Sequence, residues 1–253
     1  MKTAIITGAS SGLGVELLRA AVELCPQIEC FWLIARRKDR LEALAKQFPN
    51  KDIRAISLDL TVTASFDKLS ELLADEMPEV DILINNAGFG KLCDFADAER
   101  DSQLTQVDLN CRALTAVTHA ALPYMHRGGL IMNISSIASF APTPRMSVYC
   151  STKAYVQSFS RAMHEELRPA GINVMAVCPG PMDTEFLSVA GCEKGQSPTF
   201  DNLPHQSPSK MAHNALKAGL HGKSVYTMGA FYRFYRFLAH ILPKSLLMKM
   251  TRC

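Results

Sequence analysis

The feature that most constrains the fold is a regular alternation of short apolar runs with segments of helical period. The runs predict strands at residues 2–8, 30–36, 53–60, 81–88, 129–136, 172–180 and 224–229, and the segments between them predict helices at 13–25, 38–48, 64–75, 99–126, 148–168 and 208–221. Consecutive apolar residues such as Phe31-Trp32-Leu33-Ile34 are typical of strands covered on both faces. The alternation therefore predicts an α/β fold with one doubly wound parallel sheet of about seven strands and helices on both faces.

Length and composition fit a single domain of this kind. The chain has 253 residues, 48% of them hydrophobic and 20% charged, which excludes a disordered protein. The longest stretch without Asp, Glu, Lys or Arg, residues 128–144, contains two prolines, so we expect no membrane span. The eight cysteines and seven histidines show no metal-ligand spacing, and the N-terminal apolar run reaches Gly8 too early for a secretory signal. We therefore predict a cytoplasmic protein with reduced thiols and no metal site.

A glycine-rich turn joins the first predicted strand to the first helix. The segment runs Thr7-Gly8-Ala9-Ser10-Ser11-Gly12-Leu13-Gly14. Glycines at such a junction allow a tight turn and a close backbone approach to a pyrophosphate, while the helix N-terminus offers free N–H groups. A plain turn is the alternative interpretation. The position of the turn favours phosphate binding, with the candidate residues Gly8, Ser10, Ser11, Gly12, Leu13 and Gly14.

The residues after the second strand indicate which dinucleotide would bind. NAD sites usually place a carboxylate there for the ribose hydroxyls, whereas arginine accommodates a 2′-phosphate. Here the strand ends in Arg36-Arg37-Lys38, with no carboxylate. A solvated basic helix start is the alternative, but cations are unfavourable at a helix N-terminus unless an anion lies between them. We therefore predict NADP(H), bound through Arg36 with Arg37 or Ser11 assisting.

Three polar residues form the candidate catalytic group. Ser136 follows the fifth predicted strand, and Tyr149 and Lys153 lie four residues apart on one face of a predicted helix. A phenol with a pKa near 10 is a poor acid–base at neutral pH, and we expect the Lys153 charge to lower the pKa of Tyr149. Ser136 could then hydrogen-bond a substrate oxygen. A buried tyrosine beside a snorkelling lysine is the alternative.

Taken in order, these motifs resemble those of the short-chain dehydrogenase/reductase family over residues 1–230. The matching elements are the glycine-rich turn, Asp59-Leu60, Asn85-Asn86-Ala87-Gly88, Asn110, Ser136, Tyr149-x-x-x-Lys153, and Pro179-Gly180-Pro181 with Thr184. The resemblance implies a Rossmann-like fold and an oxidoreductase acting on CH–OH groups.

The resemblance also implies a role for each matching residue. Asp59 and Leu60 would lie at the adenine ring, and Asn86, Ala87 and Gly88 along the adenine ribose. Asn110 would hold a water in a proton relay to Lys153, which would also bind the nicotinamide ribose. Pro179, Gly180 and Thr184 would cover the nicotinamide amide and the phosphates. The sequence departs from the family pattern in two ways: no glycine pair follows Ser136, and Ser135 competes with Ser136 for the catalytic role. The spacing to Tyr149 favours Ser136.

Two segments point to the substrate and to partners. The stretch 185–206 is loop-like and should close over the substrate, and an apolar wall is expected from Phe89, Gly90, Phe140, Met146, Phe186, Leu187, Val189 and Phe200. Residues 231–253 form a basic amphipathic extension, because no acidic residue follows Asp201 while eight Lys and Arg do. We expect this extension to pack on the body or on a second subunit of a dimer or tetramer. Contact with a membrane surface is the less favoured alternative, and nothing beyond charge suggests nucleic acid.

Together these features predict an NADP(H)-dependent oxidoreductase that interconverts an apolar ketone or aldehyde and an alcohol, with Tyr149 as the acid–base. The alternative is a catalytically silent NADP-binding sensor or scaffold subunit. The complete set Asn110, Ser136, Tyr149 and Lys153 argues against that alternative.

Overall fold

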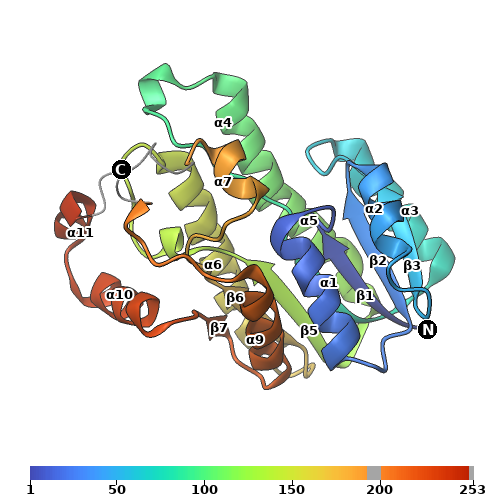
Figure 1. Cartoon of the computed structure of the whole chain (residues 1–253). Helices are drawn as coiled ribbons and strands as arrows, with labels where there is room; N and C mark the ends of the chain where they lie inside the picture. Colours follow the sequence, from blue (N-terminus) through green and yellow to red (C-terminus); the bar gives the residue numbers. More distant parts are fainter. Residues whose placement is uncertain (193–200, 251–253) are drawn as a thin grey trace.

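A computed structural model of the chain describes residues 1–192 and 201–250 (Figure 1). At its centre is a seven-stranded sheet in the order β3-β2-β1-β4-β5-β6-β7. The strands are β1 Lys2–Thr7, β2 Cys30–Ala35, β3 Asp52–Ser57, β4 Glu79–Asn85, β5 Met125–Ile134, β6 Asn173–Val177 and β7 Val225–Tyr226. All six neighbouring pairs are parallel. The predicted doubly wound, Rossmann-like sheet is therefore confirmed.

Helices cover both faces of this sheet (Figure 1). Those with long regular runs are α1 Gly12–Leu24, α2 Lys38–Ala45, α3 Thr63–Glu76, α5 Leu114–Ala121, α6 Ser147–Leu167 and α9 Pro208–Leu220. The alternation along β1 shows why both faces need cover: Ala4 and Ile6 pack with α1 and α9, whereas Ile5 packs with α3 and α5. The consecutive apolar residues of the strands thus fill two separate cores.

The predicted helix over 99–126 is helical from Arg100 to Tyr124, but it is not one regular α-helix. The segment divides into α4 Arg100–Val107, a π-helical turn at Asp108–Ala113, α5, and a short 3₁₀ turn at Leu122–Tyr124. Pro123 lacks an N–H and falls where α5 gives way to that turn. The strand β5 then begins at Met125, four residues earlier than expected, because Met125 already pairs with Val80 of β4. The register shifts after this pair, and regular pairing resumes where Leu130 lies opposite Ile82.

The segment after β6 is less loop-like than the sequence indicated. Residues Glu185–Ala190 form the short helix α7, whose N-cap Thr184 accepts a hydrogen bond from the backbone N–H of Phe186 at 3.4 Å. Gly191 ends the helix with a φ of 70°, in the left-handed region. Phe200, which we placed in the substrate wall, lies outside the described residues.

The C-terminal extension contains α10 Ala230–Ile241 and α11 Lys244–Met250. Tyr232 and Ala239 of α10 are buried against the body, and the Tyr232 hydroxyl donates to the carbonyl of Pro204 at 2.7 Å. Several apolar side chains on another side of α10 are exposed: Phe231, Phe234, Phe237 and Ile241. The extension that we expected to pack on protein is therefore partly uncovered in the single chain. Within the described residues, no helix is both long and apolar enough to cross a membrane.

Candidate active site

A cavity of about 750 Å³ lies at the carboxyl ends of the strands, where α/β sheets of this order bind their ligands. It brings together almost every residue that the sequence predicted for the cofactor: Gly8, Ser10, Ser11, Gly12, Leu13, Arg36, Arg37, Asp59, Leu60, Asn86, Ala87, Gly88, Tyr149, Lys153, Pro179, Gly180 and Thr184. Ser136 also lines it. Gly14 and Asn110 do not, and both act from behind the cavity wall.

The glycine-rich turn is held against the end of β4. Gly8 has a φ of 66°, and a Cβ there would lie 2.8 Å from Cα of Ala87, so only glycine fits this turn. The Asn86 amide nitrogen donates to the carbonyls of Thr7 and Gly8 at 3.1 Å each. A Cβ at Gly14 would meet the Asn86 side chain at 2.8 Å, so this glycine lets α1 pack closely on the turn. The turn is therefore a tightly packed cradle that lines the cavity, at the place where the sequence predicts pyrophosphate binding.

Asp59 and the two arginines lie at the far end of the cradle. Burial alone would raise the pKa of Asp59, but hydrogen bonds from the Thr61 N–H and hydroxyl, together with the Arg36 charge, hold it below its usual value. Arg36 is exposed, whereas Arg37 donates to the Ser10 hydroxyl at 3.1 and 3.2 Å and to the Ser11 hydroxyl at 2.7 Å. The two guanidinium groups that the sequence singled out thus differ: one is free to meet an anion from solvent, and the other is tied to the glycine-rich turn.

Three of the candidate catalytic residues, Ser136, Tyr149 and Lys153, meet in the buried part of the cavity, and Asn110 lies behind its wall. Asn110, Ser136, Tyr149 and Lys153 each expose 8% of their surface or less. The Ser136 side chain lies near enough to the Tyr149 hydroxyl to lower its pKa, and the Lys153 ammonium lies 5.7 Å from the centre of the Tyr149 ring. Ser135, the competing serine, instead donates its hydroxyl to the Lys153 backbone carbonyl at 2.8 Å. This arrangement favours Ser136 as the serine that faces a substrate.

The pKa of Tyr149 departs from the sequence expectation. Burial raises it above its usual value, and the Ser136 side chain only partly opposes that shift. The Lys153 charge does not lower it as expected, because the ammonium donates to the Ile134 carbonyl at 2.8 Å and faces the ring. Burial also lowers the pKa of Lys153 to about 8. Both groups are therefore less readily charged here than in water, as acid–base sites often require.

Asn110 lies in the π-helical turn that interrupts the predicted helix. Its side-chain oxygen accepts from the Phe89 N–H at 3.0 Å, and its amide nitrogen donates to the Phe89 carbonyl at 2.8 Å and to the Thr152 hydroxyl at 3.0 Å. A Cβ at Gly88 would lie 2.7 Å from the Asn110 oxygen and 3.3 Å from the Lys153 ammonium. Asn110 thus supports the wall beside Lys153, and π-helical turns commonly occur at functional sites.

The apolar wall is built partly from the expected residues and partly from the C-terminal extension. Phe89, Met146, Phe186, Leu187 and Val189 line the cavity, joined by residues that the sequence analysis did not assign there: Leu203, Phe231, Tyr232, Tyr235, Leu238 and Leu247. Gly90 packs against the Tyr149 ring, since a Cβ there would lie 2.7 Å from it. Phe140 packs against Tyr235, with ring centroids 6.0 Å apart. Among the described residues of the predicted wall, these two are not part of the cavity lining.

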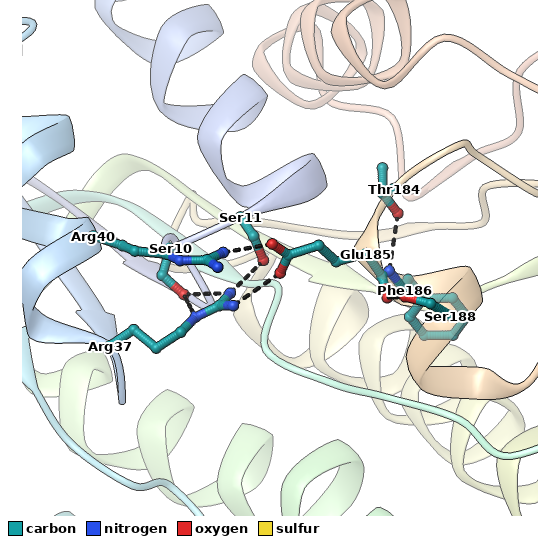
Figure 2. Close-up of polar contacts among 8 residues, drawn as sticks. All are labelled: Ser10, Ser11, Arg37, Arg40, Thr184, Glu185, Phe186 and Ser188. Atoms are coloured by element: carbon teal, nitrogen blue, oxygen red, sulfur yellow. Dashed lines mark hydrogen bonds and ion pairs between the residues drawn. The ribbon is translucent and has the colours of Figure 1, made fainter.

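Two further features escaped the sequence analysis. Glu185, the first residue of the predicted substrate segment, forms ion pairs with Arg37 and Arg40, as Figure 2 shows. No local signal could reveal this contact, because more than 140 residues separate the partners. Among the described residues, Glu79, Asp81 and His126 also lie close enough to offer three metal ligands. They sit at the start of β4 and in β5, away from the cavity, and the Lys2 ammonium already lies 3.4 Å from Asp81.

The fold and this site define a dinucleotide-binding α/β protein with a Ser–Tyr–Lys group at the end of its cavity. A model of the short chain dehydrogenase family matches residues 2–193. The chain therefore belongs to the short-chain dehydrogenase/reductase family and is an oxidoreductase.

Named relatives have a range of substrates. The NADP-dependent 3-hydroxy acid dehydrogenase of Schizosaccharomyces pombe is 35% identical over 226 residues, 86% of either chain. A short-chain dehydrogenase from Sphingobium yanoikuyae in complex with NADPH has a TM-score of 0.79 at 30% identity, covering 98% of this chain and 96% of its own. The bulky-bulky ketone specific alcohol dehydrogenase from Comamonas testosteroni has a TM-score of 0.75 at 27% identity, covering 98% and 94%.

Proposed function

We propose that this protein is an NADP(H)-dependent reductase or dehydrogenase that interconverts an apolar ketone or aldehyde and the corresponding alcohol in the cytoplasm. The observation that carries the proposal is the contact between Ser136 and Tyr149 beside the Lys153 ammonium, inside a cavity whose other end holds the glycine-rich turn and Arg36. The NADPH complex of the Sphingobium relative and the name of the S. pombe relative support the choice of cofactor.

The chemistry divides between the cofactor and the chain. When bound, the nicotinamide would supply a hydride to the carbonyl carbon of a ketone or aldehyde, or accept one from the corresponding carbon of the alcohol. The Ser136 hydroxyl orients the substrate oxygen, and the Tyr149 hydroxyl gives that oxygen a proton or takes one from it. The Lys153 ammonium holds the ribose hydroxyls of the cofactor. Gly8 to Gly14, Asp59, Leu60, Asn86 to Gly88, Pro179, Gly180 and Thr184 hold the rest of the dinucleotide, and Asn110 positions the wall beside Lys153.

The lining around Tyr149 favours an apolar substrate over a hydroxy acid. Ile137, Met146, Phe186, Leu187, Val189, Tyr235, Leu238 and Leu247 carry no charge. A carboxylate substrate would need a cationic partner, which these residues of the described lining do not offer. The Comamonas relative, described as specific for bulky ketones, supports the same choice.

The decisive test is Tyr149→Phe, followed by NADPH absorbance with a panel of apolar ketones. We expect kcat to fall by about 10²–10⁴-fold because the proton donor is lost, while the NADPH dissociation constant changes little because the ring remains. Tyr155→Phe is the matched control, since Tyr155 lies on the same helix but is 41% exposed. A variant that keeps more than about a tenth of the wild-type rate would contradict the role of Tyr149. A wild-type protein that binds NADPH but turns over no carbonyl would support the silent-sensor alternative.

We also propose that the chain forms a homo-oligomer, a dimer or tetramer. The exposed Phe231, Phe234, Phe237 and Ile241 make an apolar face that needs cover. The last 52 residues carry eight basic and no acidic residues, whereas the first 201 carry 19 basic and 24 acidic residues, so a neighbouring subunit offers a complementary charge. Light scattering should give a multiple of 27.8 kDa. A monomer that floats with anionic liposomes would instead support the membrane-surface alternative.

A further inference from the structure

The carboxylate of Glu185 lies where α7 meets the arginines that follow β2. It accepts from Nη1 of Arg37 at 2.9 Å and from Nη1 of Arg40 at 2.5 Å. Figure 2 shows the two guanidinium groups on one side of the carboxylate, with Ser10 and Ser11 beside Arg37. The remaining contacts of Arg37 go to these two serines of the glycine-rich turn. A carboxylate from the substrate segment thus occupies the cationic end of the cofactor cradle.

This carboxylate is a permanent charge. Hydrogen bonds from Arg40 and Arg37 lower the pKa of Glu185 to about 2, so it stays ionised at every physiological pH. The three side chains are between 39% and 48% exposed, and ion pairs this exposed add little to folding stability. We therefore expect the contact to affect ligand binding by Arg37 and Arg40 more than folding stability.

An arginine fork matches the oxygens of a carboxylate and of a phosphate equally well. The donors that Arg37 and Arg40 give to Glu185 are those that a phosphate dianion arriving at this end of the cradle would use. Two anions on the same guanidinium groups would also repel each other.

We propose that Glu185 is a specificity-determining residue, which competes with the cofactor's 2′-phosphate for Arg37 and Arg40 and so limits the preference for NADPH over NADH. The proposal rests on the proposed function only in placing the 2′-phosphate at this end of the cavity. Binding of the phosphate releases Glu185, whereas NADH leaves the ion pairs in place.

The same helix extends this effect to the substrate side. Phe186 follows Glu185, and its ring lies 5.7 Å from the Tyr149 ring at an angle of 50°. Because α7 has only six residues, a change in the anchorage of Glu185 alters the position of Phe186 beside the proton donor. The Michaelis constant for a carbonyl substrate should therefore differ between the two cofactors.

The test is Glu185→Gln, which removes the charge and keeps the side-chain size. The matched control is Asp183→Asn, because Asp183 lies two residues away but pairs with His205 at 2.6 Å and with neither arginine. Equilibrium titrations should show NADPH binding about 3- to 10-fold tighter in Glu185→Gln, the scale of two exposed charge pairs, with NADH changed less than about twofold. The gain should shrink at high salt because exposed charges are screened.

The outcomes separate this inference from the proposed function. Weaker or unchanged NADPH binding in Glu185→Gln, or equal changes for NADPH and NADH, would overturn the role of Glu185 even if the wild type prefers NADPH and reduces ketones. A wild type that binds NADH as tightly as NADPH, and gains nothing for either cofactor in Glu185→Gln, would overturn the 2′-phosphate placement itself. The comparison of 2′,5′-ADP with 5′-AMP as ligands gives the same readout without turnover.

Discussion

Replacing Lys153 by methionine should make the protein more stable at neutral pH while removing its activity. Burial lowers the pKa of Lys153 from 10.5 to about 8. A tenfold change in a protonation equilibrium is worth about 1.4 kcal/mol, so the ammonium costs the folded state about 3 kcal/mol below pH 8. Methionine removes that cost but leaves the Ile134 carbonyl without the donor it now has at 2.8 Å, a loss of about 1 kcal/mol. The expected net gain at pH 7 is about 2 kcal/mol.

The lowered pKa of Lys153 also predicts how the stability difference between wild type and Lys153→Met changes with pH. Because the folded pKa lies below the unfolded one, the unfolded chain binds more protons between pH 8 and 10.5, and wild-type stability due to Lys153 rises across that window. Lys153→Met lacks this rise. Urea unfolding of both proteins at pH 7.0 and pH 9.5 should therefore show the advantage of the variant falling from about 2 kcal/mol towards zero. The other ionisable groups are shared, so the difference reports on Lys153.

Two results would refute this reasoning. If Lys153→Met is less stable than wild type at pH 7, the buried ammonium is not a net cost. If the difference in free energy of unfolding between the two proteins is the same at both pH values, Lys153 does not titrate between pH 8 and 10.5. Activity should be lost in either case, since the proposed mechanism needs the charge, and stability gained at the expense of activity is common at active sites.

Two further predictions concern the ends of the cofactor site and of the chain. Arg36→Ala should weaken NADPH binding about 10- to 100-fold, because a charge-assisted contact is worth roughly 1.5–3 kcal/mol, and should leave NADH binding nearly unchanged; equal losses in paired titrations would contradict the assignment. Removal of residues 231–253 should lower the melting temperature by about 6 °C or more, because Tyr232 is buried against Gly180 and a large aromatic is worth about 3 kcal/mol. An unchanged melting temperature in calorimetry would show that the extension does not pack on the body.

The sequence by itself determined the sheet and most of the site. Strands covered on both faces need consecutive apolar residues, and this local requirement identified all seven strands, although β5 begins earlier than predicted. The positions of Ser136, Tyr149 and Lys153 relative to the strand and helix ends followed from spacing, because parallel strands bring their carboxyl ends together. The glycine-rich turn could also be predicted from the sequence, because a position without room for a side chain, such as Gly8, requires glycine.

The tertiary structure decided the electrostatics and the far walls of the cavity. The pKa of Tyr149 depends on how deeply it is buried and on which side of its ring Lys153 lies, and neither is a property of the interval between the two residues. Glu185 reaches Arg37 across 148 positions, and Tyr232 closes over Gly180 from the C-terminal extension. Such contacts arise only when the chain folds back on itself, because periodicity and spacing carry information about near neighbours, whereas burial and charge pairing depend on residues distant in the sequence.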